Sequence, residues 1–191
     1  MKIPLSNTML DLGDQSSTSY VHPELRRYFN EPSGQEHYRL LVYLGFCFNG
    51  VNITDIGTYM GGSAVALGQN PKNKIFSFDI LNSKHDIPMP NVEFYLGDFH
   101  SDTKIHKSLL ESKVIFLDID HLYSNEIWIY NFLKENKWSG PLLCDDIHLN
   151  DEMKRFWNEV DSPKVDITAY GHVTGTGCIY MGNNDIEFDL R

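Results

Sequence analysis

A glycine-rich turn constrains the fold of this chain more than any other feature. The β-branched run 51–54 is followed, at positions 55–65, by Asp-Ile-Gly-Thr-Tyr-Met-Gly-Gly-Ser-Ala-Val. This order predicts a strand, a tight turn and the start of a helix. Glycines let the backbone approach a ligand closely, and the N–H groups of a first helical turn point toward it. The segment therefore predicts a binding site for a small polar ligand.

The glycine spacing differs from that of dinucleotide-binding turns. The pattern Gly-x-Gly-x-x-Gly would require a glycine at Tyr59, and a bulky side chain there disfavours a pyrophosphate on the turn. A nicotinamide-dependent oxidoreductase is therefore disfavoured. Asp55, at the expected strand end, can accept hydrogen bonds from a cationic or hydroxylated ligand. An isolated turn of this kind is equally compatible with an ordinary strand-to-helix connection. The choice between a binding site and an ordinary connection therefore depends on residues later in the chain.

Acidic residues recur at the ends of four later strand-like runs. The runs lie at 74–79, 92–96, 114–118 and 141–145, and their acids are Asp79, Asp98, Asp118 and Asp145. One acid after a strand usually caps a helix or lies in a solvated turn. Five strands that deliver acids to one edge are harder to explain in this way, because open parallel sheets bind ligands at the carboxyl ends of their strands.

Alternating segments predict an α/β fold with a parallel sheet. Helical patterns are expected at 22–30, 35–46, 62–69, 103–111, 124–137 and 151–160. The short runs 164–169 and 177–181 predict a terminal hairpin. We expect seven strands in a doubly wound sheet with helices on both faces. The glycine-rich segment 171–177 is expected to be the hairpin turn, and a role in lining an acceptor pocket is the alternative.

Length and composition agree with one enzyme-sized domain. At 191 residues and 41% hydrophobic content, the chain can bury one substantial core. We expect a single domain over 1–191, with a polar arm or lid at 1–34 and the core of the fold at 35–183. The formal net charge of −10 disfavours nucleic acid as a partner, because phosphate binding needs a basic surface.

The sequence also predicts a cytoplasmic protein without membrane contact. No apolar run approaches the roughly 20 residues of a membrane span, and residues 1–19 lack the basic and apolar regions of a signal peptide. Cys47, Cys144 and Cys178 lie in apolar contexts without metal-type spacing. They are expected to be buried free thiols in a reducing compartment.

The turn resembles the S-adenosylmethionine site of class I methyltransferases, in which an acid is followed by two glycines that three residues separate. Its Gly-x-Tyr-x-Gly-x-Ser-Ala version at 57–64 closely resembles the catechol O-methyltransferase group. The resemblance covers about 35–183 and implies a Rossmann-like sheet whose last strand is antiparallel. It implies that S-adenosylmethionine is bound by Asp55, Gly57, Thr58, Tyr59, Gly61, Ser63, Asp79, Ile80, Asp98, Phe99 and Asp118.

Three of these residues have more specific expected roles. Asp79 lies 24 positions after Asp55, close to the spacing at which a ribose-binding acid follows a nucleotide-type glycine turn. Its carboxylate can bind both ribose hydroxyls. By resemblance to the methyltransferases, Asp98 or Phe99 contacts the adenine base.

The acids after the fourth and fifth strands indicate a metal. Crowded carboxylates repel one another unless a cation compensates, and hard oxygen ligands suit Mg²⁺. The layout resembles the metal-dependent O-methyltransferases, and this resemblance makes Asp118, Asp145 and Asp146 the metal ligands. It implies that Mg²⁺ holds a substrate hydroxyl, lowers its pKa and aligns it with the methyl group, while a base removes the proton.

Asp120 and His121 are the candidate catalytic bases. The catechol enzymes carry a lysine where this chain has His121. Related enzymes that methylate sugar hydroxyls of natural products carry Asp-x-Asp-x-Tyr, and residues 118–123 resemble that pattern with one extra residue before Tyr123. We favour Asp120 as the base. The departure from the catechol pattern leaves the acceptor class open.

The sequence therefore predicts an S-adenosylmethionine-dependent O-methyltransferase that uses Mg²⁺ and a small-molecule acceptor. Two alternatives remain open. One is a metal-independent methyltransferase in which the aspartates orient the acceptor, and the other is a catalytically silent S-adenosylmethionine-binding domain. The oligomeric state, including a homo-oligomer, is also left open.

Overall fold

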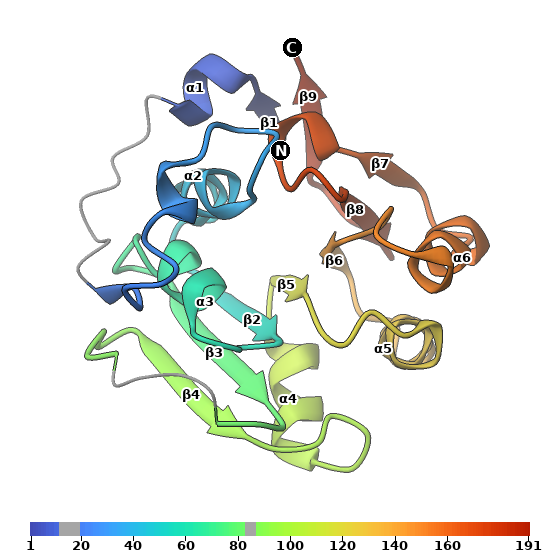
Figure 1. Ribbon diagram of the computed structural model, residues 1–191. Coiled ribbons are helices and arrows are strands. Elements are labelled where there is room, and N and C mark those ends of the chain that lie inside the picture. The colour runs from blue at the N-terminus through green and yellow to red at the C-terminus, as the bar shows by residue number, and fades with distance from the viewer. Residues whose placement is uncertain (12–19, 83–86) are drawn as a thin grey trace.

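A seven-stranded sheet forms the centre of the protein (Figure 1). The computed structural model describes residues 1–11, 20–82 and 87–191. From one edge to the other, the strands are β4 (Val92–Leu96), β3 (Lys74–Asp79), β2 (Asn52–Ile56), β5 (Val114–Leu117), β6 (Gly140–Asp145), β8 (Thr176–Met181) and β7 (Lys164–Asp166). β8 pairs antiparallel with β6 and β7, and the other neighbouring pairs are parallel. The predicted mostly parallel sheet with an antiparallel last strand is confirmed.

The central strands are apolar because helices cover both faces of the sheet. Every residue of β5 and β6 is buried, as expected for parallel strands that pack on both sides. One face is covered by α2 (Tyr38–Cys47) and α3 (Gly62–Leu67), and the other by α4 (Thr103–Glu111), α5 (Tyr123–Glu135) and α6 (Asp151–Glu159). Cys144 and Cys178 are buried free thiols, as predicted, whereas Cys47 is only half-buried.

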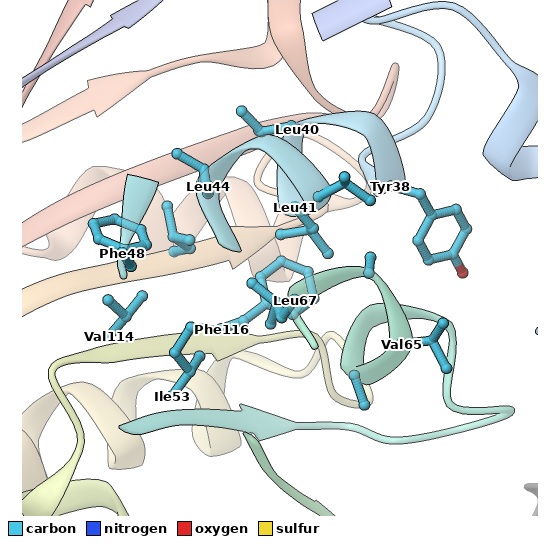
Figure 2. Close-up of a cluster of buried hydrophobic side chains, with 14 of the residues drawn as sticks. Tyr38, Leu40, Leu41, Leu44, Phe48, Ile53, Val65, Leu67, Val114 and Phe116 are labelled. Atoms are coloured by element: carbon cyan, nitrogen blue, oxygen red, sulfur yellow. The ribbon is translucent and has the colours of Figure 1, made fainter. Parts of the chain in front are cut away.

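Figure 2 shows the apolar core beneath α2. Leu41 and Leu44 of α2 lie close to Leu67 of α3 and Phe116 of β5, and all four side chains are fully buried. Burying a side chain of this kind stabilises the fold by about 1.5–3 kcal/mol. The packing fixes α2 against the sheet and so determines where the residues that precede this helix lie.

The N-terminal helices are shorter than predicted. The segment predicted as a helix at 22–30 forms turns and the 3-10 helix η2 (Tyr28–Asn30). Its backbone bonds span three residues, as in the bond from the Leu25 N–H to the His22 carbonyl (2.9 Å), and therefore do not build an α-helix. The helix predicted from position 35 begins at Tyr38. No helix in the described parts of the chain combines the length and the apolar character needed to cross a membrane.

The strand predicted over 164–169 ends early, at Asp166. The Asp166 carboxylate accepts the Thr168 N–H at 2.9 Å, and this local bond competes with continued strand pairing. The chain then turns into the 3-10 helix η3 (Thr168–Tyr170) before it enters β8.

The two ends of the chain form a second sheet that the sequence did not predict. β1 (Lys2–Leu5) pairs in parallel with β9 (Glu187–Leu190), and α1 (Asn7–Asp11) follows β1 (Figure 1). Ile3, Leu5 and Leu10 are buried in the same core as α2. The predicted 1–34 arm therefore includes packed structure, and its residues 12–19 lie outside the described residues. Its role as a lid stays a prediction.

Candidate active site

A cavity of about 480 Å³ opens at the carboxyl ends of the parallel strands. A volume in this range is typical of small-molecule sites. Its lining includes many of the residues singled out from the sequence: Gly57, Tyr59, Ile80, Asp79, Asp98, Phe99, Asp118, Asp120 and His121. Loops that are far apart in the sequence meet here because β2, β3, β4 and β5 end at the same edge.

The turn after β2 lies directly against the end of β5. Gly57 has a φ of 100°, a conformation that favours glycine. A Cβ atom at this position would overlap the carbonyl oxygen of Asp118. Glycine is therefore required both by the backbone conformation and by the close approach. Gly61 ends the turn and immediately precedes α3.

The Asp79 carboxylate is held at the cavity wall by two backbone groups. Its Oδ2 accepts the Tyr59 N–H at 2.7 Å, and its Oδ1 accepts the Leu81 N–H at 2.9 Å. A carboxylate can accept about four hydrogen bonds, so Asp79 keeps capacity for the hydroxyls of a ligand. Ile80, beside it, is 70% exposed and offers an apolar surface to the cavity.

The loop after β4 adds an aromatic wall. The ring of Phe99 lies 4.3 Å from that of His100 and 5.6 Å from that of Trp128, measured between centroids. Asp98 shapes this loop, since its carboxylate accepts the His100 N–H (2.9 Å) and the Ser101 hydroxyl (3.3 Å). A ring that lines a cavity can stack on a flat heterocycle.

Three residues predicted to bind the cofactor have buried side chains and do not line the cavity. Asp55, Thr58 and Ser63 are at most 5% exposed. The Ser77 hydroxyl donates to Asp55 Oδ2 at 2.6 Å and lies 2.6 Å from Thr58 Oγ1. Burial raises the pKa of Asp55 to about 7. These hydrogen-bonded groups stabilise the conformation of the turn. Their direct contact with a cofactor stays a prediction.

Three aspartates and two histidines form a cluster at the ends of β5 and β6. His121 Nε2 lies 3.3 Å from Asp118 Oδ1 and 2.9 Å from Asp146 Oδ2. His172 Nδ1 lies 3.2 Å from Asp145 Oδ2 and 3.1 Å from Asp146 Oδ1. The aspartates predicted as metal ligands therefore lie in one cluster, but with imidazoles between them.

Two further members of this cluster were missed by the sequence analysis. His37, immediately before α2, is 4% exposed, and its Nδ1 lies 3.0 Å from Asp145 Oδ2. The same nitrogen lies 3.2 Å from Glu36 Oε1. No local spacing marks this pair, because only the packing of α2 brings it to the end of β6.

His172 could have been found from its segment, which combines three glycines with a histidine and two threonines. Residues 171–175 of this segment connect η3 to β8, in agreement with the predicted turn, and residues 176 and 177 begin β8. The segment also places polar side chains on the cluster, since the Thr174 hydroxyl donates to Asp146 Oδ1 and the Thr176 hydroxyl donates to Asp145 Oδ1.

Comparison with solved structures shows which type of fold this chain has. The chain matches the O-methyltransferase TomG from Streptomyces achromogenes, solved with SAM, at 16% identity and a TM-score of 0.58, over 92% of this chain and 94% of that chain. It matches the SAH-bound methyltransferase PaMTH1 from Podospora anserina at 15% identity and a TM-score of 0.58, over 76% and 78% of the two chains. This chain has the class I methyltransferase fold.

A methyltransferase from Geobacter sulfurreducens shows the same fold at 13% identity and a TM-score of 0.59, over 88% of this chain and 90% of that chain. Neither a protein-family model nor a curated protein sequence matches this chain. This chain therefore resembles these proteins in its fold and not in a detectable sequence match.

Within this methyltransferase fold, histidines supply positive charge to the carboxylates. The neighbouring carboxylates of Asp118 and Asp146 raise the pKa of His121 to about 10. Burial opposes the charge of His172, but its contacts with Asp145 and Asp146 raise its pKa to about 11. Both rings are therefore imidazolium groups at neutral pH, and they balance the aspartates that surround them.

His37 and Asp145 form a buried pair in which each group stabilises the charged form of the other. Burial opposes the charge of each group, yet Asp145 raises the pKa of His37 to about 9, and His37 helps to lower the pKa of Asp145 to about 2. Burial raises the pKa of Asp118. Asp146 differs, because its contacts with His121 and His172 outweigh its burial and hold its pKa far below the usual range.

Asp120 and His121, the two candidate bases, face different partners. Asp120 is exposed at the cavity, where its Oδ2 accepts the Asn125 side-chain N–H at 2.7 Å. The ring of His121 instead contacts Asp118 and Asp146 in the cluster. The carboxylate of Asp120 therefore keeps capacity to accept a proton from a molecule in the cavity.

The three aspartates do not form an all-oxygen metal site by themselves. In the described residues, every set of three candidate ligand atoms within 4.8 Å of one another includes a histidine: Glu36–His37–His172, His37–Asp118–Asp145, Asp118–His121–Asp146 and Asp145–Asp146–His172. Mg²⁺ takes oxygen ligands and keeps several waters, whereas imidazole nitrogen suits ions such as Zn²⁺. The donor set therefore does not fit the predicted Mg²⁺ centre.

Proposed function

We propose that this protein is an S-adenosylmethionine-dependent methyltransferase that methylates a hydroxyl group of a small molecule. One observation carries the proposal. A single cavity, at the carboxyl edge of a sheet with the methyltransferase fold, has Asp79 in one part of its wall and Asp120 and His121 in another. The solved structures with this fold include one in complex with SAM and one bound to SAH, which supports the choice of cofactor.

The part of the cavity around Asp79 suits a nucleoside. The unused lone pairs of the Asp79 carboxylate can accept hydrogen bonds from two ribose hydroxyls. Ile80 and Phe99 offer apolar and aromatic surface on which an adenine ring can pack. Tyr59 replaces the glycine that a pyrophosphate would need, so a nicotinamide dinucleotide is a poorer occupant.

The part of the cavity around Asp120 suits proton removal from an acceptor. As the hydroxyl oxygen bonds to the methyl carbon, its proton passes to the Asp120 carboxylate and the carbon–sulfur bond breaks. S-adenosylhomocysteine then leaves as the neutral sulfide. His121 already holds a proton, because its pKa is raised to about 10. It is therefore suited to donate a hydrogen bond to the acceptor oxygen rather than to act as the base.

Methyl transfer without Mg²⁺ is the form of this proposal that the donor set favours. The imidazolium groups of His121 and His172 provide the positive charge that the sequence analysis assigned to a metal. The cluster would then hold the acceptor in position through hydrogen bonds, and orientation of this kind supplies a large share of many enzymes' rate enhancement.

The test is transfer of an isotopically labelled methyl group from S-adenosylmethionine to pooled small molecules that carry hydroxyl, amine or thiol groups. Mass spectrometry of the products should find the label on the hydroxyl pool, with and without EDTA. Label on amines or thiols alone would contradict O-methylation. Loss of all transfer in EDTA would contradict the metal-independent form.

A further inference from the structure

We propose that Asn125 is a positioning residue, which fixes the carboxylate of Asp120 and links it through His100 to the methyl-donor part of the cavity. The three side chains form one hydrogen-bonded chain, and all three line the cavity. The inference rests on the proposed function, because it assigns a supporting group to the proposed base.

The Asp120 carboxylate is held by two N–H groups at the start of α5. Its Oδ2 accepts the Asn125 side-chain N–H at 2.7 Å, and its Oδ1 accepts the Leu122 N–H at 3.4 Å. A carboxylate can accept about four hydrogen bonds, so lone pairs remain for an acceptor hydroxyl. The bond from Asn125 is the shorter of the two and is therefore the stronger restraint on where those lone pairs point.

The chemistry of the three groups fixes the direction of each hydrogen bond. An ionised carboxylate only accepts, so the amide nitrogen of Asn125 faces Asp120 and the amide oxygen faces His100. The distance from Asn125 Oδ1 to His100 Nε2 is 3.0 Å. Because an amide oxygen also only accepts, Nε2 of His100 must carry a proton. The charge of Asp120 therefore determines the form of a histidine ring that it does not touch.

The chain of side chains joins two parts of the cavity wall. His100 belongs to the loop after β4 and Asp120 to the loop after β5, and these strands are separated in the sheet by β3 and β2. Asn125, in the first turn of α5, bonds to both loops. Phe99, on which an adenine ring can pack, precedes His100 in the first loop. The position of the proposed base is thus coupled to the surface proposed for the methyl donor.

Helix α5 also orients the histidine ring. The ring of Trp128 lies 4.8 Å from that of His100, measured between centroids, with an interplanar angle of 71°. Edge-to-face packing of this kind is favourable for aromatic rings. Trp128 follows Asn125 by three residues, so the two side chains are neighbours on the helix surface. One helix therefore sets both the amide and the ring that it bonds to.

Replacement of Asn125 gives the first test. Asn125→Asp keeps the shape of the side chain, but it removes the N–H donor and places a second carboxylate against Asp120. Asn125→Asp and Asn125→Ala should each lower kcat by about 10–100-fold, the cost of misplacing a reacting group, and should change KM for S-adenosylmethionine far less. Asn136→Ala is the matched control, since Asn136 lies at the other end of α5, where it donates to the Phe132 carbonyl (2.8 Å). It should keep kcat.

A double-mutant cycle separates positioning of the base from a general structural effect. With Asp120→Asn in place, Asn125→Ala should lower kcat by less than about twofold, because no carboxylate base is left to position. An equally large loss in both backgrounds would show that Asn125 acts independently of Asp120, and the proposal would be wrong. It would also be wrong if Asp120→Asn lost activity while both Asn125 variants kept it, a result that leaves the proposed function intact.

Nitrogen-15 NMR of the histidine rings tests the chain without methyl transfer. In the wild type, His100 should give the signals of a ring protonated at Nε2, and Asn125→Ala should shift them. His148, which pairs with Asp166 at the surface (2.7 Å), is the internal control and should keep its signals. Protonation of His100 at Nδ1 alone, or His100 signals that Asn125→Ala leaves unchanged, would contradict the proposal. Absence of methyl transfer by the wild type would contradict the proposed function instead, and the NMR result would still decide whether this chain exists.

Discussion

The Nε2 atom of His121 lies 2.9 Å from Asp146 Oδ2, and both residues have left-handed backbones, with φ of 59° and 57°. Residues other than glycine rarely adopt this conformation, which costs on the order of 1 kcal/mol or more at each position. The loops after β5 and β6 are therefore bent so that an imidazole and a carboxylate meet. Strain of this kind concentrates at functional sites, which agrees with an active site at this edge of the sheet.

Replacement of Asp120 tests which group removes the acceptor proton. Asp120→Asn should lower kcat by about 10²–10⁴-fold, the usual contribution of a general base, and leave the affinity for S-adenosylhomocysteine unchanged. Asp161→Asn, which changes an exposed carboxylate paired with Lys134 (2.7 Å), is the control and should keep kcat. Steady-state kinetics with an identified acceptor gives the measurement. The assignment of the base is reversed if Asp120→Asn retains activity and His121→Ala abolishes it.

The pH dependence of stability tests the charge of His121. Its pKa is raised from 6.5 to about 10, since the carboxylates of Asp118 and Asp146 lie beside its Nε2 and stabilise the charged ring. Between these two values the folded state binds more protons at His121 than the unfolded state, so stability falls as pH rises. The contribution of His121 is fully present below pH 6.5 and is lost as pH rises through about 10.

The variant His121→Gln removes this contribution and keeps a polar side chain. Urea unfolding at pH 7 and at pH 10 should show a larger loss of stability for the wild type than for the variant. The difference isolates His121, because the other groups titrate in both proteins. Equal losses in the two proteins would mean that His121 is not charged at neutral pH.

A methyl group at Gly57 tests the contact between the turn and β5. Gly57→Ala should destabilise the fold by more than about 1 kcal/mol, because the new Cβ meets the Asp118 carbonyl and the residue has φ of 100°. Gly50→Ala is the matched control, since Gly50 also has a positive φ (76°) but no atom within 4 Å of an added Cβ. Chemical denaturation should show a clearly larger effect at Gly57. Equal effects would show that only backbone conformation matters there.

Local patterns were enough to predict the sheet and most of the cavity lining. β-branched runs, glycines and acids are signals that lie within a few residues of one another. The ends of β2 and β3 and the position of Asp79 could therefore be predicted directly from the sequence. The sequence could not tell that Asp55 is buried and does not line the cavity, because burial depends on the packing of α3. His37 and Glu36 carry no local signal either, since only the docking of α2 brings His37 to Asp145 and Glu36 close to His172. The β1–β9 pair joins the two ends of the chain and was missed for the same reason.

The most direct test of the account is a calorimetric titration of S-adenosylhomocysteine into the wild-type protein and into Asp79→Ala. The wild type should bind, and the variant should bind more weakly by about 1–3 kcal/mol, since it loses hydrogen bonds from ribose hydroxyls to a charged group. Asp161→Ala, a surface carboxylate paired with Lys134, should bind like the wild type. Binding of NADH without any heat from S-adenosylhomocysteine, or unchanged affinity in Asp79→Ala, would contradict the assignment of this cavity to the methyl donor.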